Sequence, residues 1–227
     1  MTHGHAVLFS TLSPELCQCM SESKARHIDP FEILAEYYPV QSKAHDILVR
    51  HGELVAAKAL RIAERAGIAA PDADFIWEAA MLHDIGIFMT HAPSIGCHGA
   101  HAYICHGYLG RELLEKKGLF RHARVCETHV GVGITAREIK ERNLPLPLRD
   151  MVPVSVEEQI ICYADKFYSK DRLFRDREKS VKAIMQDLEK YGRDKVLRFK
   201  SWVDRFEQVP PDLPGNGSLP DLRVTAE

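Results

Sequence analysis

Six residues of types that bind transition metals recur along the chain, each within or beside an apolar stretch. Two of them, a histidine and an aspartate, are adjacent in the run AAMLHDIG (79–86), among alanine, methionine and leucine. Burying a polar pair without partners is costly, and burying an unpaired carboxylate costs more, so a bound cation would explain the pair. The full set is His51, His83, Asp84, His106, His129 and Asp165.

The number of these residues favours metal binding over ordinary core hydrogen bonding. A single inward histidine is more often a hydrogen-bonded core residue than a ligand. Six such groups in one core can satisfy one another only partly, whereas divalent cations would saturate all of them. Imidazole and carboxylate ligands without thiolate suit Fe, Mn, Co or Zn.

The segments that must position these residues have helical periodicity. Between residues 42 and 67 the apolar positions recur every three or four residues and include His51, which predicts a helix with His51 on its buried face, ended by Gly67. Further helices are predicted at 71–84, broken near Gly86, and at 101–118, 119–131, 156–174, 179–192 and 193–207. Ser155 with Glu158 predicts a capping box for the helix that carries Asp165.

The predicted fold is therefore an all-α, single-domain helical bundle with flexible termini. Residues 1–30 have few periodic apolar positions and predict a loosely attached N-terminal segment. Residues 31–208 form the domain. Residues 209–227 contain four prolines and two glycines and predict a tail that adds little to stability.

Composition narrows the classes of partner and the location. The 227 residues carry a net charge of -2, which argues against extended nucleic acid or an anionic membrane as the main partner. The start lacks the pattern of a secretory signal and no long apolar run occurs, so a cytoplasmic location is expected. The six cysteines form no CxxC pair and predict reduced, packed thiols. The sequence is compatible with a homodimer.

The order of these residues resembles a known family. His51, then His83-Asp84, then Asp165 resemble the H…HD…D signature of the HD superfamily of metal-dependent phosphohydrolases, and HDIG (83–86) with YAD (163–165) is the form used by its HDIG subgroup. The resemblance extends over residues 44–175. It implies that His51, His83 and Asp165 bind one ion.

Two further histidines resemble those of dinuclear members. His106 in HGYLG and His129 in ETHVG are similar to the residues by which such members, including the HD-GYP phosphodiesterases, hold a second metal. The resemblance therefore implies two divalent transition-metal ions, with Asp84 as the bridging, catalytic carboxylate. About three protein ligands per ion would leave positions open for water and substrate, as catalysis requires.

Substrate-binding residues are less clearly marked. HD-GYP proteins carry a lysine after HDIG, where this chain has Ile87, so other donors must contact a phosphate. On the helix of Asp165, Lys166, Ser169 and Lys170 are candidates. Arg149 in a proline-rich loop is another. The long connection FMTHAPSIGCHGAH (88–101) adds His91 and His98, which we expect near the metals.

These observations favour hydrolysis of a phosphate ester or anhydride of a small molecule, such as a nucleotide, by a metal-activated water. The alternative is a mixed-valence di-iron oxygenase, because the same ligands resemble those of HD-type oxygenases. A third reading is a non-catalytic nucleotide or metal sensor, which a full ligand set makes the weakest of the three. No base-specific motif identifies the substrate.

Overall fold

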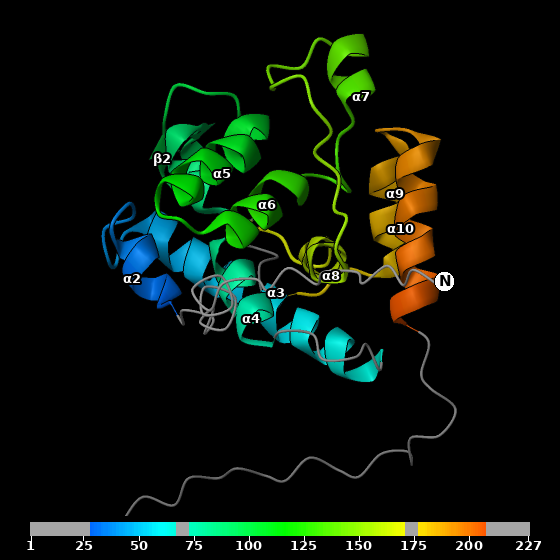
Figure 1. The fold of residues 1–227 in the computed structure, drawn as a ribbon, viewed down its shortest axis with the longest axis horizontal. Helices are drawn as coiled ribbons and strands as arrows, with labels where there is room; N and C mark the ends of the chain where they lie inside the picture. Colours follow the sequence, from blue (N-terminus) through cyan, green and yellow to red (C-terminus); the bar gives the residue numbers. More distant parts are fainter. Residues whose placement is uncertain (1–27, 67–72, 171–176, 208–227) are drawn as a thin grey trace, which may run out of the picture.

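The structure, a computed structural model, describes residues 28–66, 73–170 and 177–207. Helices dominate these ranges, which confirms the all-α prediction (Figure 1). A short antiparallel pair of strands, β1 (His91–Ala92) and β2 (Cys97–His98), lies in the long connection after the HDIG run. The α-helices are α2 (Pro30–Ala35), α3 (Lys43–Arg65), α4 (Ala73–Leu82), α5 (His106–Lys116), α6 (Phe120–Thr128), α7 (Ala136–Glu141), α8 (Val156–Asp165), α9 (Val181–Glu189) and α10 (Arg193–Phe206).

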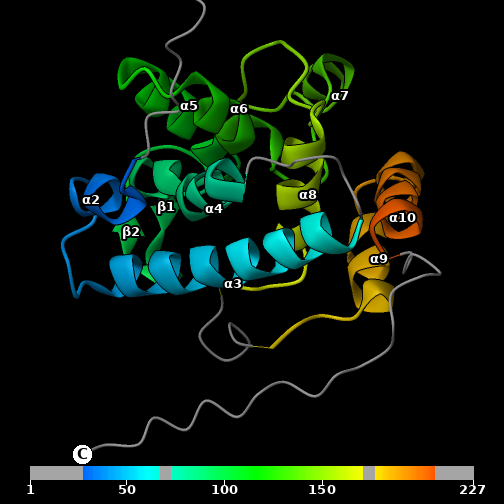
Figure 2. The same ribbon diagram turned by 60° about the horizontal axis from the view of Figure 1, so that its bottom comes forward.

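The longest helix of the described residues, α3, packs against α4 and α8. Ser42 begins it as the N-cap, with its side chain accepting a hydrogen bond from the backbone N–H of His45 at 3.2 Å. Its predicted face is buried and packs along both α4 and α8 (Figure 2). Fully buried Val55 and Ile62 each contribute about 1.5–3 kcal/mol relative to an exposed side chain.

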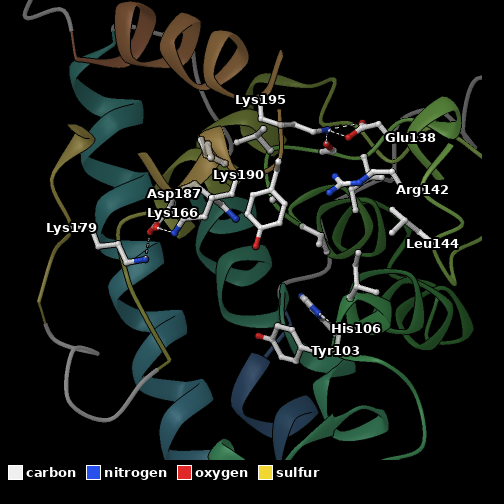
Figure 3. Close-up of a pocket in the computed structure, with 18 residues that line it drawn as sticks. Tyr103, His106, Glu138, Arg142, Leu144, Lys166, Lys179, Asp187, Lys190 and Lys195 are labelled. Atoms are coloured by element: carbon white, nitrogen blue, oxygen red, sulfur yellow. Dashed lines mark hydrogen bonds and ion pairs between the residues drawn. The ribbon is translucent and has the colours of Figure 1, made fainter. Parts of the chain in front are cut away.

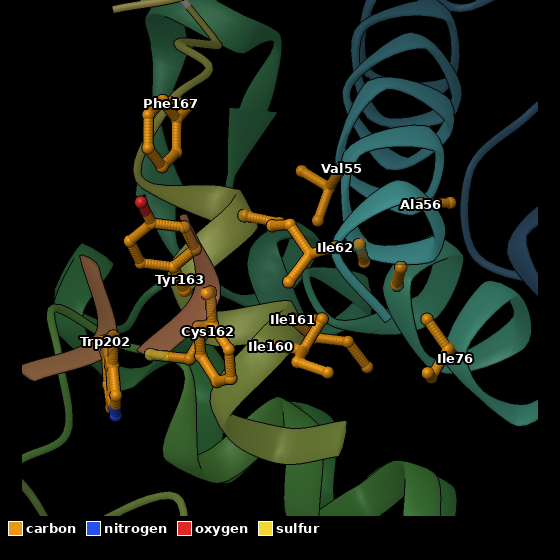
Figure 4. Packing of buried hydrophobic residues seen from close by; sticks show 14 of the residues in the cluster. Val55, Ala56, Ile62, Ile76, Ile160, Ile161, Cys162, Tyr163, Phe167 and Trp202 are labelled. Atoms are coloured by element: carbon orange, nitrogen blue, oxygen red, sulfur yellow. The ribbon is translucent and has the colours of Figure 1, made fainter. Parts of the chain in front are cut away.

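The second half of α8 is buried on all sides because other elements surround it, whereas its first turn carries polar residues. Its residues 160–165 are all buried, and Ile160, Ile161, Cys162 and Tyr163 lie in the main hydrophobic core (Figure 4). Tyr163 stacks on Phe199 of α10, with ring centroids 5.1 Å apart. Ser155 caps it as predicted, accepting from Glu158 N at 3.1 Å. The Glu158 carboxylate instead accepts from Val154 N at 3.0 Å, so only half of the predicted capping box forms.

The prediction that the helix of Asp165 continues to residue 174 was wrong. Asp165 is the last residue of α8, and the next three backbone N–H groups bond to carbonyls three residues back, a tightened 3₁₀ turn. Phe167 O then accepts from Lys179 N at 2.8 Å. Lys166, Ser169 and Lys170 therefore follow the helix instead of lying on it.

Two other helix limits also differ from the prediction. The helix predicted from residue 101 begins at His106, because His101 forms a bridge with Thr90 and the 3₁₀ turn η3 (Tyr103–Cys105) follows it. The helix before the HDIG run ends at Leu82 instead of including the HD pair, which lies in a turn followed by the 3₁₀ helix η1 (Ile85–Met89).

Several predictions concern the ends of the chain. Residues 1–27, with Cys17 and Cys19, and residues 208–227 lie outside the described residues. Pro30, the last residue of the predicted N-terminal segment, is buried as the first residue of α2. The four cysteines in the described ranges are buried and free, as predicted. None of the helices in these ranges combines the length and apolarity needed to cross a membrane.

The glycine of the HDIG run allows two elements to approach closely. A Cβ at Gly86 would overlap the backbone carbonyl oxygen of His106 and lie 2.5 Å from Gly110 N, at the first turns of α5. Both neighbours are backbone atoms, which cannot rotate away as a side chain can. Gly86 therefore sets the distance between η1 and α5.

We predict that Gly86→Ala lowers the free energy of unfolding by about 3 kcal/mol, because the new methyl group must displace backbone of α5. Gly118→Ala is the matched control. Gly118 has φ +76° and no atom near its Cβ position, so its substitution should cost only about 1–2 kcal/mol of left-handed strain. Urea denaturation of both variants measures the difference, and a Gly86→Ala loss no larger than that of Gly118→Ala would contradict this packing.

Candidate metal centre

The structure brings together all six residues that the sequence analysis selected, although they come from distant segments. We call them the six-residue cluster: His51, His83, Asp84, His106, His129 and Asp165. His51 lies in the middle of α3, and the other members lie at or just beyond helix ends. All six are buried, with exposed fractions between 1% and 7%. Three overlapping groups drawn from them place their ligand atoms within 4.8 Å of one another.

The two carboxylate oxygens of Asp84 face different halves of the cluster. Oδ2 lies 3.4 Å from His51 Nε2 and 3.0 Å from His83 Nε2. Oδ1 lies 3.4 Å from the Nε2 atoms of both His106 and His129. Asp165 joins the first half, with its Oδ1 at 2.9 Å from His51 Nε2. The Asp84 carboxylate therefore lies between two sets of nitrogen donors.

Backbone carbonyls orient three of the imidazoles. The Nδ1 atoms of His83, His106 and His129 lie 2.5, 2.6 and 2.7 Å from the carbonyl oxygens three residues earlier in each case. Because a carbonyl only accepts, each Nδ1–H donates, and in the neutral ring Nε2 carries the lone pair. The Nε2 atoms point to the centre, as in metal-binding histidines.

The facing imidazole nitrogens are closer than two lone pairs favour. His106 Nε2 and His129 Nε2 are 3.0 Å apart. With both Nδ1 atoms donating to carbonyls and both rings neutral, neither Nε2 has a hydrogen to share. A cation between them would remove this repulsion, which is the first observation that fits a metal.

Unsatisfied polar atoms give the second observation. Although both oxygens of Asp84 have charged neighbours, neither makes a hydrogen bond of acceptable geometry within the described residues, nor does His51 Nδ1. Leaving a buried polar group without a hydrogen bond costs about 1–3 kcal/mol. The ammonium of Lys170, 2.6 Å from Oδ2, offsets part of this cost for Asp84. The candidate ligand groups contain only histidine and aspartate, so their donor atoms are nitrogen and oxygen. The residues therefore fit divalent Fe, Mn, Co or Zn.

Burial lowers the pKa of three cluster histidines, whereas neighbouring carboxylates raise the pKa of the fourth. Burial lowers the pKa of His51 to about 4 and that of His106 to about 3, and it lowers the pKa of His129 as well. Burial by itself also lowers the pKa of His83, but the adjacent Asp84 and Asp165 raise it to about 9. In the metal-free protein one imidazolium thus compensates the carboxylates, and a metal must displace its proton.

The acidic members stay ionised. Burial by itself would raise the pKa values of Asp84 and Asp165, but the cations beside them hold both well below the usual range. For Asp84 the cations are His83 and Lys170, whose Nζ is 2.6 Å from Oδ2. For Asp165 they include Lys166, whose Nζ is 2.6 Å from its Oδ2.

Four of the six predicted substrate-binding residues lie at the cluster or line a cavity beside it, and the other two do not. Lys166 and Lys170 contact the cluster directly, and Ser169 and His91 line a cavity next to it. His98 pairs with His91 across the strand pair and is exposed. Arg149 instead donates to the buried carboxylate of Glu127, with Nε 2.7 Å from Oε1.

Two cavities adjoin the cluster. One, of about 640 Å³, is lined by His106, Lys166 and residues of the 130–144 and 179–195 segments (Figure 3). The other, of about 600 Å³, is lined by Lys170 and residues of the strand-pair segment. Tyr103 borders both, and its ring centroid is 4.7 Å from that of His106. Tyr103 was not predicted as a residue beside the site, because its sequence segment has the spacing of a helix.

A match to a known protein family identifies the family of this chain. Residues 48–169, just over half of the chain, match the family described as HD domain. The chain belongs to the HD domain family. HD domains bind divalent metals, and the cluster provides side chains that could hold them. Membership also supports a metal-dependent hydrolase in general terms.

Relatives of this HD domain chain include longer proteins. A protein of Picrophilus torridus named tRNA (cytidine(56)-2'-O)-methyltransferase is 31% identical over 211 residues, 92% of this chain and 50% of that protein. A protein of the same name from Thermoplasma volcanium is 29% identical over 57% of this chain and 34% of its own length. An uncharacterized protein of Methanocaldococcus jannaschii is 31% identical over 52% of this chain and 60% of its own length. No solved structure matches significantly.

The divided pKa values predict how the stability of the metal-free HD domain chain depends on pH. In the folded protein the pKa is about 4 for His51 and about 3 for His106, whereas in the unfolded chain it is about 6.5. Below about pH 6.5 the unfolded state therefore binds more protons than the folded state, and stability falls with falling pH. His83 acts oppositely: its contribution is complete below pH 6.5 and is lost as pH rises through about 9. We therefore predict maximal stability near pH 6.5.

Urea denaturation in chelator at pH 5, 6.5 and 9 measures this dependence. Between pH 6.5 and 5, each histidine with a lowered pKa should reduce the free energy of unfolding by up to ~1.4 kcal/mol per pH unit. His106→Gln should flatten that slope, whereas His45→Gln, outside the cluster on α3, should leave it unchanged. Equal stability at pH 6.5 and pH 5 would contradict the divided pKa values.

Proposed function

We propose that this HD domain chain is a metal-dependent phosphohydrolase acting on a phosphate ester or anhydride of a nucleotide or another small phosphorylated metabolite. The observation that carries the proposal is Asp84, a buried carboxylate with one oxygen toward each of two donor sets. Family membership supports the hydrolase class, and the two adjoining cavities provide room for a substrate.

Each of the two donor sets would hold one metal ion. His51, His83 and Asp165 would hold one divalent ion, His106 and His129 would hold another, and Asp84 would bridge them. Bound there, the ions would supply an activated water and stabilise charge on the phosphoryl oxygens. The carbonyls that fix the imidazole rings hold this geometry ready before substrate arrives.

Two lysines would contact the phosphate. Ile87, at the position after HDIG, is fully buried and cannot provide a cation. Lys170 is the replacement that the geometry favours, because its Nζ lies 2.6 Å from Asp84 Oδ2 and its side chain lines a cavity. Lys166 lies on the other side, where its Nζ contacts Asp165 and the carbonyl oxygen of His129. Both ammonium groups can donate to phosphoryl oxygens seated at the cluster.

The relatives bear on the choice of substrates to test. Two of them are named for a tRNA methyltransferase, but at least half of each lies outside the aligned segment, so that activity does not extend to this chain by alignment. The names support including RNA fragments beside nucleotides in a substrate panel. A di-iron oxygenase is the alternative, because the same nitrogen and oxygen donors suit iron.

We predict that Asp84→Ala abolishes phosphate-ester hydrolysis and lowers metal content, because the shared carboxylate is removed. Lys170→Met should retain metal but reduce turnover by about 100-fold, since one cation at the phosphate is lost. Lys182→Met, an exposed lysine of α9 outside both cavities, is the matched control. Product release from nucleotides, sugar phosphates and RNA fragments is measured with each metal, together with metal content.

Three outcomes would overturn the proposal or its assignments. Normal turnover by Asp84→Ala would remove the bridging role. Oxygen uptake by a coloured iron form without ester hydrolysis would establish the oxygenase. Tight metal or nucleotide binding with no turnover of any kind would establish a sensor.

We also predict that the purified protein holds two metal equivalents, and that the double change His106→Ala and His129→Ala reduces them to about one. The reason is that both Nε2 donors of one proposed ion are removed, while His51, His83 and Asp165 remain. Elemental analysis after gel filtration measures the ratio. One equivalent that the double change does not alter would show a mononuclear site.

A further inference from the structure

Lys58 is a buried lysine that lies outside the metal centre and the two cavities. It is on α3, seven residues after His51, so the two side chains share one face of that helix. Only 5% of Lys58 is exposed, and burying an ammonium group is costly unless a partner compensates its charge. Its Nζ donates to Glu178 Oε1 at 2.8 Å and lies 3.7 Å from the centre of the Phe167 ring. Lys58 therefore joins α3 to two residues of later segments.

The Glu178 carboxylate connects α3 with the stretch that follows α8. Its Oε2 accepts a hydrogen bond from the hydroxyl of Tyr168 at 3.1 Å, while Oε1 accepts from Lys58. Burial by itself would raise the pKa of Glu178, but the hydrogen bond and charge of Lys58 hold it below its usual range, so the pair is ionised. The next residue, Lys179, donates its backbone N–H to Phe167 O at 2.8 Å. Residues 178 and 179 thus hold both Phe167 and Tyr168.

These contacts fix the middle of residues 166–170, which we call the lysine segment. At one end Lys166 Nζ is 2.6 Å from Asp165 Oδ2, and at the other end Lys170 Nζ is 2.6 Å from Asp84 Oδ2. The two aromatic residues held from the next segment lie between these lysines. Lys170 belongs to no helix or strand, so the position of its ammonium group depends on side-chain contacts made by its neighbours.

We propose that Lys58 and Glu178 are positioning residues for Lys170: their ion pair holds the lysine segment so that the Lys170 ammonium meets a phosphoryl oxygen at the cluster. This inference rests on the phosphate-binding role proposed for Lys170. Neither residue of the pair belongs to the six-residue cluster or lines either of the two cavities, so both would act through the segment that they hold. A misplacement of about 1 Å can cost ~100-fold in rate, so loss of this support should be measurable.

Chemical labelling of lysines tests the positioning without any turnover. Lys58→Met removes the ammonium but keeps a side chain of similar length against Phe167, and Glu178→Gln removes the charge at the other end of the pair. In each metal-loaded variant, reductive methylation of Lys170 should be about ten-fold faster than in the wild type, because the lysine segment opens more often. Mass spectrometry of peptides measures the rate at each lysine.

Two controls separate local positioning from general loosening of the fold. Lys195, a buried lysine of α10, should keep its wild-type rate in both variants of the pair. Lys117→Met breaks a lysine–glutamate ion pair outside the cluster and should leave the Lys170 rate unchanged. An unchanged Lys170 rate in both variants of the pair, or an equal rise at Lys195, would overturn the positioning role.

Turnover then tests whether the positioning serves the reaction. With an ester that the wild type hydrolyses, Lys58→Met should lower kcat by about ten-fold and leave the metal content unchanged. In the Lys170→Met background the same change should cost no further turnover, because the group that it positions is already absent. Equal losses in both backgrounds would show that the pair acts independently of Lys170 and would overturn the inference.

The two measurements distinguish failure of this inference from failure of the proposed function. If the wild type hydrolyses no ester, the phosphohydrolase proposal fails, and the labelling rates still decide whether Lys58 and Glu178 position Lys170. If the wild type hydrolyses esters but the labelling of Lys170 is unchanged in both variants, the inference fails and the proposed function stands.

Discussion

The structure depends on keeping the carboxylate of Asp84 ionised inside the bundle. Its two oxygens are buried and face four imidazole nitrogens at 3.0–3.4 Å, but none of these contacts has the geometry of a hydrogen bond. In an environment of low polarity such a group requires positive charge nearby. The imidazolium of His83 and the ammonium of Lys170 provide it in the metal-free protein. Divalent cations would provide more, and would engage the lone pairs of His106 and His129.

Helix ends and one close backbone contact meet this requirement. Five of the six cluster residues lie where helices begin or end, so side chains from α5, α6 and α8 can converge on a residue in the middle of α3. Gly86 brings α5 close enough for His106 to share the carboxylate. Cavities lie beside the cluster, and they provide the space that a substrate of the proposed reaction needs.

Chemistry and periodicity in the sequence predicted much of this arrangement. The three-to-four spacing placed His51 on a buried face, and the cost of burying Asp84 predicted a shared site. After α8 ends at Asp165, Phe167 O accepts a hydrogen bond from the distant Lys179 N, a contact that local pattern cannot predict. Likewise, the partner of Arg149 is Glu127, 22 residues earlier in the chain, which the local pattern could not identify. Tertiary partners decide such residues.

The central claim is that one carboxylate serves two metal ions. Crystals of the protein purified with its metal, measured at that metal's absorption edge, test it directly. If Asp84 serves two ions, we expect two anomalous peaks roughly 3.5–4 Å apart, one on each side of its carboxylate. One peak would be bounded by His51, His83 and Asp165, and the other by His106 and His129. A single peak, or peaks away from Asp84, would contradict the account.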